Sequence, residues 1–159
     1  MKIYLAGPLF TLAERDFNAA LASRLRSEPY NHKVWLPQEY EQGGKEERAT
    51  FENDVNGIEW SDVVVANMDG ADPDSGTCWE CGYAYARQIG VVIFRTDWRA
   101  AGKSGPTSYN LMMTQSADER LPTHRGDVSH LAAKIHQAAE RVRQKRPRSV
   151  RPELNSRNP

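Results

Sequence analysis

The sequence predicts a three-layer α/β sandwich built on a mostly parallel sheet of about five strands. Its apolar runs are short and continuous, as at residues 63–66 (VVVA) and 91–94 (VVIF). Such runs are typical of parallel strands that are covered on both faces. The stretches between the runs are long enough for right-handed crossover helices. A chain of 159 residues has the length of one domain with a sizeable core.

Four apolar runs locate strands, at residues 3–6, 33–36, 62–67 and 91–95. The region 102–123 has no pattern that locates a fifth. In a doubly wound sheet, ligands bind at the carboxyl ends of the strands, where the strand order reverses. If the first and third strands are neighbours, the segments that follow them should meet at this point.

Four helices are expected between and after the strands. The first follows Thr11, which with Glu14 has the form of a capping box. The second covers residues 46–60 and carries Phe51, Val55 and Ile58 as an apolar stripe. The third runs over residues 76–88. The last begins after Asp127 as N-cap, with Val128, Leu131, Ile135, Ala138 and Val142 on one face.

Composition excludes several classes of protein. The 21 basic and 21 acidic residues cancel, so no global field favours nucleic acid or a membrane. No apolar run approaches the roughly 18–20 residues of a membrane span, and no signal-peptide pattern opens the sequence. We therefore expect a cytoplasmic protein with no nucleic-acid or membrane partner.

The last part of the chain changes in composition. We expect a domain over residues 1–140 and a basic tail rich in Pro and Arg over residues 141–159. A solvated tail is the favoured interpretation, and contact with nucleic acid through its arginines is the alternative.

Two cysteines, Cys78 and Cys81, form a lone C-x-x-C motif. The motif could be redox-active or half of a zinc site. The sequence has no second cysteine pair to complete a metal cage, so no metal is expected.

Three acids are candidates for chemistry. Glu80 is the only acid between residues 77 and 89, within an otherwise apolar helix that is expected to pack against the sheet or another subunit. Thr77 and Glu80 also match a capping box, and Asp74 could serve as a turn or cap residue. Asp54 lies at the edge of the second helix's apolar stripe. Acids in different environments are what glycosyl chemistry needs, whereas three surface acids are the ordinary alternative.

A nucleotide-phosphate cradle is not expected at the sheet edge. The segment after the first strand has one glycine, Gly7, rather than a glycine-rich phosphate loop. The segment after the third strand, residues 69–74, is rich in acids that would repel phosphate.

Four segments together resemble the nucleoside 2-deoxyribosyltransferase family: residues 4–10 (YLAGPLF), 53–58 (NDVNGI), 74–84 (DSGTCWECGYA) and 109–112 (YNLM). The resemblance covers about residues 1–115, in the same order and spacing. It implies a flavodoxin-like (Rossmann-like) sandwich and an enzyme that exchanges nucleobases on 2′-deoxynucleosides without a cofactor. Two displacements at C1′, through a glycosyl-glutamate, would retain configuration.

The resemblance also implies roles for individual residues. Glu80 matches the nucleophile, Tyr4 the tyrosine that orients it, and Asp74 and Asp54 the acids that contact and protonate the leaving base. The substrate-binding positions that it implies are Gly7, Leu9, Phe10, Gln38 and Asn110. Leu9 and Phe10 would pack against the base, and Gln38 would help to read it. Asn110 would reach the sugar 5′-hydroxyl in a neighbouring subunit, which requires a homo-oligomer.

Two other functions stay open. One is the hydrolysis of (deoxy)nucleoside 5′-monophosphates by an N-glycosidase of similar fold. The other is a non-catalytic nucleotide-binding domain. Glu80 favours an enzyme over the binding domain, because a pure binding module has no need of an acid at this position. The acids of residues 69–74 favour a neutral 5′-hydroxyl over a 5′-phosphate.

Overall fold

A computed structural model describes residues 1–40, 46–98 and 109–146. In chain order the elements are β1 (Lys2–Ala6), α1 (Leu12–Arg26), β2 (Lys33–Trp35), the 3₁₀ turn η1 (Pro37–Glu39), α2 (Glu47–Trp60), β3 (Val63–Asn67), α3 (Ser75–Ala86), β4 (Gly90–Phe94), α4 (Leu111–Ser116), β5 (Glu119–Arg120) and α5 (Val128–Lys145). The predicted α/β sandwich is confirmed.

The five strands form one parallel sheet in the order β2-β1-β3-β4-β5. This is the flavodoxin-like order, in which the chain reverses direction across the sheet between β1 and β3. The two strands pair from Ile3↔Val63 to Ala6↔Ala66. The segments that leave β1 and β3 therefore start side by side at the carboxyl edge, as predicted.

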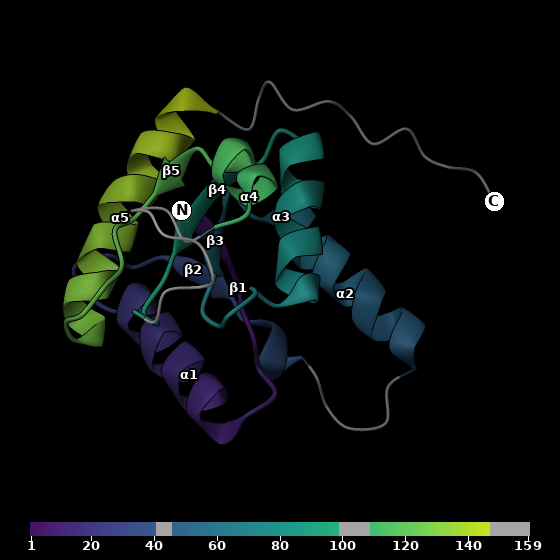
Figure 1. Ribbon diagram of the computed structural model, residues 1–159, viewed down its shortest axis with the longest axis horizontal. Helices are drawn as coiled ribbons and strands as arrows, with labels where there is room; N and C mark the ends of the chain where they lie inside the picture. Colours follow the sequence, from purple (N-terminus) through teal and green to yellow (C-terminus); the bar gives the residue numbers. More distant parts are fainter. Residues whose placement is uncertain (41–45, 99–108, 147–159) are drawn as a thin grey trace.

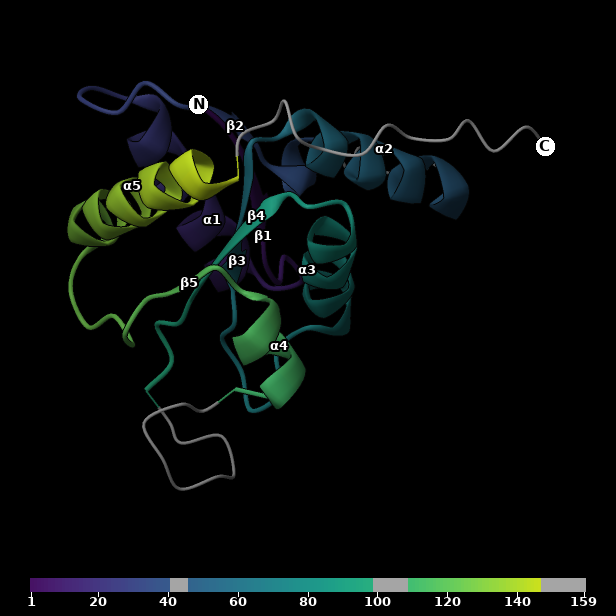
Figure 2. The same ribbon diagram turned by 90° about the horizontal axis from the view of Figure 1, so that it is seen from above.

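Helices cover both faces of the sheet (Figures 1 and 2). On one face, α1 and α5 pack over alternate strand residues such as Leu5, Val65 and Phe94. On the other face, α2, α3 and α4 cover the intervening residues, which include Tyr4 and Val64. Both faces of β3 and β4 are buried, which explains their unbroken apolar sequences.

The sequence offers a capping box at the start of two helices, α1 and α3, and the structure contains only the first. Thr11 and Glu14 form the predicted capping box at α1, and Asp127 caps α5 by accepting a hydrogen bond from the His130 amide. At α3 the capping-box alternative is wrong. Asp74 is the N-cap there, and its carboxylate accepts from the Thr77 amide at 2.8 Å. Glu80 is therefore left for another contact.

The described part of the region 102–123 holds two elements that the sequence did not locate, although it predicted about five strands. α4 has six residues, and β5 has two polar ones that pair with Val92 and Ile93 of β4. Neither is long enough to produce a periodic pattern. Phe51 also differs from expectation: it is 44% exposed rather than part of a buried stripe, and it packs against Trp79 on α3.

The last helix extends five residues past the start of the predicted tail. α5 continues to Lys145 because Val142 is fully buried against the sheet. Basic residues of this turn bind acids of the domain, as Arg141 does with Glu119 and Arg146 with Asp118. Residues 147–159 of the predicted tail lie outside the described part of the chain. Within the described residues, none of the helices is both long and apolar enough to cross a membrane.

Candidate active site

A cavity of about 130 Å³ opens at the carboxyl edge of the sheet, beside the β1–β3 reversal. Its lining comes from the β1–α1 loop, η1, α2 and the start of α3. It is lined by Gly7, Leu9, Phe10, Pro37, Asp54, Asp74, Gly76, Thr77 and Glu80. Six of these are residues that the sequence singles out as site residues, and they come from three separate segments.

The β1–α1 loop approaches β3 closely. A side chain at Gly7 would place its Cβ 3.1 Å from the Cβ of Asn67, so glycine allows this approach. Leu9 and Phe10 follow, and the Phe10 ring is 75% exposed. An exposed aromatic ring at the mouth of the cavity can stack against a planar ligand.

Glu80 and Tyr4 form the central contact of the site. Tyr4 is fully buried on β1, and its hydroxyl donates a 2.5 Å hydrogen bond to Oε1 of Glu80. Burial raises the pKa of Tyr4 far above its ordinary value, and the Glu80 and Asp54 carboxylates add to this rise. The phenol therefore stays protonated and serves as a fixed donor to Glu80.

The carboxyl of Glu80 is tuned by opposing effects. Their net result is a pKa of about 8: burial raises it most, the Tyr4 hydrogen bond lowers it, and the nearby Asp54 and Asp74 carboxylates also raise it. Loss of the Tyr4 donor should therefore raise the pKa of Glu80 above this value.

Asp54 and Asp74 reach the same cavity from different elements. Asp54 lies on α2, and its carboxylate is close enough to Tyr4 to help raise the pKa of the phenol. Asp74 stands at the start of α3, where its Oδ2 accepts from the Thr77 amide and the Thr77 hydroxyl. The cavity thus holds three carboxyl groups with different partners, and the ordinary alternative of three surface acids is wrong.

Gln38 is not among the residues that line the cavity. Its amide Nε2 donates to the backbone carbonyl of Arg15 at 2.9 Å, and its Oε1 lies 3.4 Å from Nδ2 of Asn18. Asn18 is buried and donates to the carbonyl of Pro8 at 2.9 Å. Both side chains therefore support the β1–α1 loop, whose Leu9 and Phe10 face the cavity.

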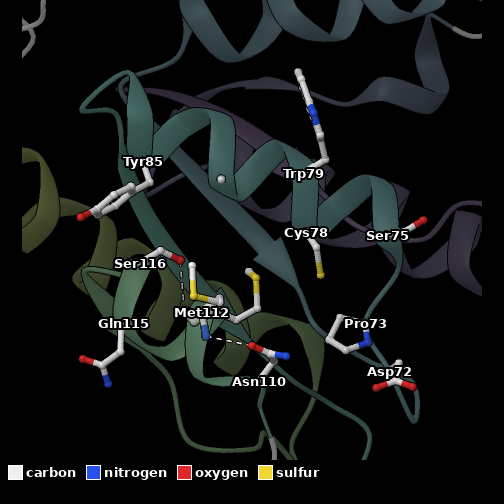
Figure 3. Close-up of a pocket in the computed structure, with 12 residues that line it drawn as sticks. Asp72, Pro73, Ser75, Cys78, Trp79, Tyr85, Asn110, Met112, Gln115 and Ser116 are labelled. Carbon is white, nitrogen blue, oxygen red and sulfur yellow. Dashed lines mark hydrogen bonds between the residues drawn. The ribbon is translucent and has the colours of Figure 1, made fainter.

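Asn110 lies apart from the cavity, at the start of α4. Its Oδ1 accepts from the Met112 amide at 2.9 Å, and it borders a hollow of about 750 Å³ between α3 and α4 (Figure 3). Cys78 points from α3 toward this hollow, whereas the Trp79 ring points away from it. The exposed apolar residues that α3 and α4 present beside this hollow, which we call the α3–α4 face, are Tyr85, Leu111 and Met112.

Both cysteines carry free thiols. Cys81 is buried in the core, and burial raises the pKa of its thiol. Among the described residues, no group of three or more histidine, cysteine or acidic side chains is arranged to hold a metal ion.

Three supporting residues were not predicted: Asn18, Thr77 and Arg95. Asn18 lies on the same helical stripe as Leu21, Ala22 and Leu25, and a polar residue within a buried stripe is the signal that could have identified it. Thr77 was considered only as a cap for Glu80. Arg95 follows β4 and donates to the carbonyls of Met68 and Gly70, in the loop that leads to Asp74. It had no signal in the sequence that separates it from a surface arginine.

The chain is similar to known proteins over most of its length. Residues 3–144 match the family model described as nucleoside 2-deoxyribosyltransferase. An uncharacterised protein of Ureaplasma parvum is 34% identical over 116 residues, which span 62% of this chain and 72% of that protein.

Solved structures are also similar. A 2-deoxyribosyltransferase from Bacillus psychrosaccharolyticus is 27% identical, with a TM-score of 0.63 over 83% of this chain and 90% of that one. A CMP N-glycosidase from Clostridium botulinum has a TM-score of 0.60 at 14% identity, over 86% of this chain and 99% of that one. The second similarity is one of fold.

Proposed function

The chain belongs to the nucleoside 2-deoxyribosyltransferase family, and we propose that it transfers 2-deoxyribose between nucleobases through a covalent intermediate on Glu80. The observation that carries this proposal is the Tyr4–Glu80 hydrogen bond inside a cavity that also holds Asp54 and Asp74. An oriented carboxylate beside further acids is the set of groups that a retaining glycosyl transfer needs.

In the first step, a carboxylate oxygen of Glu80 attacks C1′ and the N-glycosidic bond breaks. The bond's electron pair leaves with the base, which takes a proton from Asp74 or Asp54. In the second step, a nitrogen of the incoming base attacks C1′ and displaces the glutamate. The proton of the incoming base returns to the acid. Two inversions at one carbon give overall retention.

The direct test is a base-exchange assay. Deoxyinosine is incubated with free adenine or cytosine, and chromatography separates the new deoxynucleoside from free deoxyribose. We expect the new deoxynucleoside, and we expect none from Glu80→Gln protein purified in the same way, which controls for host enzymes. Release of free sugar with both acceptors and no exchange would favour a hydrolase.

Removing the Tyr4 hydroxyl should shift the pH dependence of the reaction. Glu80 attacks as a carboxylate, so kcat/KM should fall as pH falls below its pKa of about 8. Tyr4→Phe deletes the hydrogen bond that lowers this pKa, so the acid limb of the profile should move to higher pH. The highest value of kcat/KM in the pH profile should fall by about tenfold, since the nucleophile also loses its orientation.

The measurement is kcat/KM from pH 5 to 10 for both proteins. Tyr83→Phe is the matched control, because the Tyr83 hydroxyl bonds to Glu59 and Tyr83 does not line the cavity. An acid limb that stays in place in Tyr4→Phe would show that the phenol does not tune the nucleophile.

Asp74→Asn should lower the rate much more for substrates with a poorly leaving base than for substrates with an activated one. The amide keeps the shape of the carboxyl group and can still cap α3, but it cannot deliver a proton. We expect a loss of about a hundredfold with a poorly leaving base and of about threefold or less with an activated one. Initial rates with both kinds of nucleoside, for Asp74→Asn and Asp54→Asn side by side, identify the main donor.

Asp72→Asn is the control, because Asp72 belongs to the same loop and does not line this cavity. Equal losses with both substrates would mean that Asp74 positions the base without protonating it.

We also propose that the site is completed by Asn110 of a second copy bound on the α3–α4 face. Asn110 and the Glu80 cavity are separate within one chain, and Leu111 and Met112 beside it are 69% and 74% exposed. Exposed apolar side chains next to a proposed substrate ligand are what a shared, self-complementary interface provides.

Subunit mixing tests this sharing of the site. Asn110→Asp keeps the α4 cap but loses the amide donor, and we expect about a tenfold loss of activity. Excess Glu80→Gln subunits would then give each Asn110→Asp subunit a partner with an intact Asn110. We expect the activity per Asn110→Asp subunit to return toward the wild-type value after dissociation and reassociation. No recovery, in mixtures that contain mixed dimers, would place the whole site within one chain.

A further inference from the structure

A buried arginine lies at the carboxyl edge of the sheet, directly after β4. The Arg95 side chain is 2% exposed, and it is one of the largest fully buried side chains of the protein. A buried guanidinium is costly unless its N–H groups are bound to acceptors. Its partners should therefore show what the arginine holds in place.

Those partners are backbone carbonyls of two different loops. Arg95 donates to the carbonyl of Gly70 at 2.6 Å and to that of Met68 at 3.3 Å, both in the loop after β3. It also donates to the carbonyl of Asp97 at 2.7 Å and lies 3.8 Å from the carboxylate of Asp97. The guanidinium thus ties the β3–α3 loop to the segment after β4.

Asp69 makes the reciprocal connection. Its Oδ1 accepts from the amides of Thr96 and Asp97, each at 2.6 Å, and its Oδ2 accepts from the Thr96 hydroxyl. We call Asp69, Arg95, Thr96 and Asp97 the loop clamp. Asp69, from the loop after β3, is bound by the segment after β4, and Arg95, from that segment, is bound by the loop after β3.

The clamp lies beyond the sheet itself. β3 and β4 already pair over five residues, from Val63↔Gly90 to Asn67↔Phe94. What the clamp adds is a fixed path for residues 68–74, which turn sharply at Gly70 with φ of +108°. This loop ends at Asp74, whose carboxylate lines the cavity and binds Thr77.

We propose that Asp69 and Arg95 are positioning residues that set the carboxyl of Asp74 against the leaving base. This proposal rests on the proposed function. The Asp74 carboxyl is fixed from two sides: Thr77 holds it from α3, and the clamp holds the chain that leads to it. Without the clamp, the loop would still lead into α3, but residues 68–73 could adopt more than one conformation. The carboxyl of Asp74 would then be held less precisely against the base.

The test compares activity in Asp69→Ala, Asp69→Asn and Arg95→Lys proteins. Asp69→Ala should lower kcat with a poorly leaving base by about tenfold, with little change for an activated base. Asp69→Asn should recover most of this loss, because its Oδ1 can still accept from both amides. Arg95→Lys should resemble Asp69→Ala, because one ammonium cannot reach carbonyls on both loops as the guanidinium fork does.

A double-mutant cycle gives the decisive comparison. In an Asp74→Asn background, Asp69→Ala should cause no further loss, because the group that it positions no longer donates a proton. Arg146→Met is the control for general stability, since Arg146 pairs with Asp118 near the opposite end of β4. Additive losses, or equal losses with both substrates, would overturn the proposal.

Hydrogen exchange separates failure of this proposal from failure of the proposed function. The Thr77 amide is bound to the Asp74 carboxylate, so Asp69→Ala should speed its exchange by about tenfold relative to Arg146→Met. Unchanged exchange would overturn the clamp even in an active enzyme. Faster exchange in a protein without base exchange would support the clamp and overturn the proposed function.

Discussion

Replacing Glu80 with glutamine is expected to lower the rate of deoxyribose transfer by about 10⁴-fold, because a nucleophile lost from a covalent mechanism is rarely replaced. That loss corresponds to about 5.4 kcal/mol of transition-state stabilisation. Glutamine keeps the length of the side chain and can still accept the Tyr4 hydrogen bond. The fold should therefore remain, which circular dichroism and thermal melting would show beside the kinetic assay.

Trapping of the intermediate gives an independent check on the nucleophile. A 2′-fluoro-substituted nucleoside should leave its sugar attached to the peptide that contains Glu80, as detected by mass spectrometry. Asp74→Asn should still form this adduct with an activated base, because the nucleophile is intact. An adduct on Asp74, or more than about a tenth of wild-type activity in Glu80→Gln, would contradict the role assigned to Glu80.

Local sequence patterns were sufficient where the neighbouring residues decide the structure. The Thr11–Glu14 capping box is such a case, because all of its hydrogen bonds fall within the first turn of α1 and the preceding loop. The same pattern at Thr77–Glu80 gave the wrong alternative. Asp74 competes for the Thr77 amide, and Glu80 bonds to Tyr4, which lies 76 positions earlier in the chain. Contacts at that separation leave no periodic signal.

The contacts of Arg95 and Asp69 were beyond sequence reasoning for the same reason. Arg95 is the last residue of the fourth predicted strand, although β4 itself ends at Phe94, and nothing in the sequence separates it from an exposed charge at the end of a strand. It is buried because the sheet order brings the carbonyls of Met68 and Gly70 beside it. Asp69 was grouped with the acids that repel phosphate, whereas the structure shows its carboxylate bound to Thr96 and Asp97.

Deoxynucleosides should be preferred over their 5′-monophosphates by about a hundredfold or more in kcat/KM, or about 2.7 kcal/mol. A phosphate carries roughly two negative charges near neutral pH and needs cations or free amides. None of the described residues that line the cavity beside Glu80, or the larger acidic cavity of about 520 Å³ next to it, is a lysine or arginine.

The helix start and the arginines near the cavity already have partners within the protein. A helix N-terminus can bind an anion, but at α3 that position is taken by the carboxylate of Asp74 on the Thr77 amide. Arg95 lies close to this loop, but its guanidinium is buried and bound to backbone carbonyls. Arg87 pairs with Glu59 at the other end of α3. Three carboxyl groups around the cavity would add repulsion to this lack of phosphate ligands.

The measurement compares deoxyadenosine, its 5′-O-methyl ether and its 5′-monophosphate, each with the same free-base acceptor. The ether separates size from charge, because it is bulkier than the hydroxyl but neutral. If charge decides, kcat/KM should fall much less for the ether than for the monophosphate. High salt should then reduce the difference in kcat/KM between deoxyadenosine and its monophosphate, because it screens the repulsion. Equal losses for both would assign the discrimination to size. Preference for the monophosphate, with sugar phosphate as the product, would identify the protein as a hydrolase and contradict the transferase proposal.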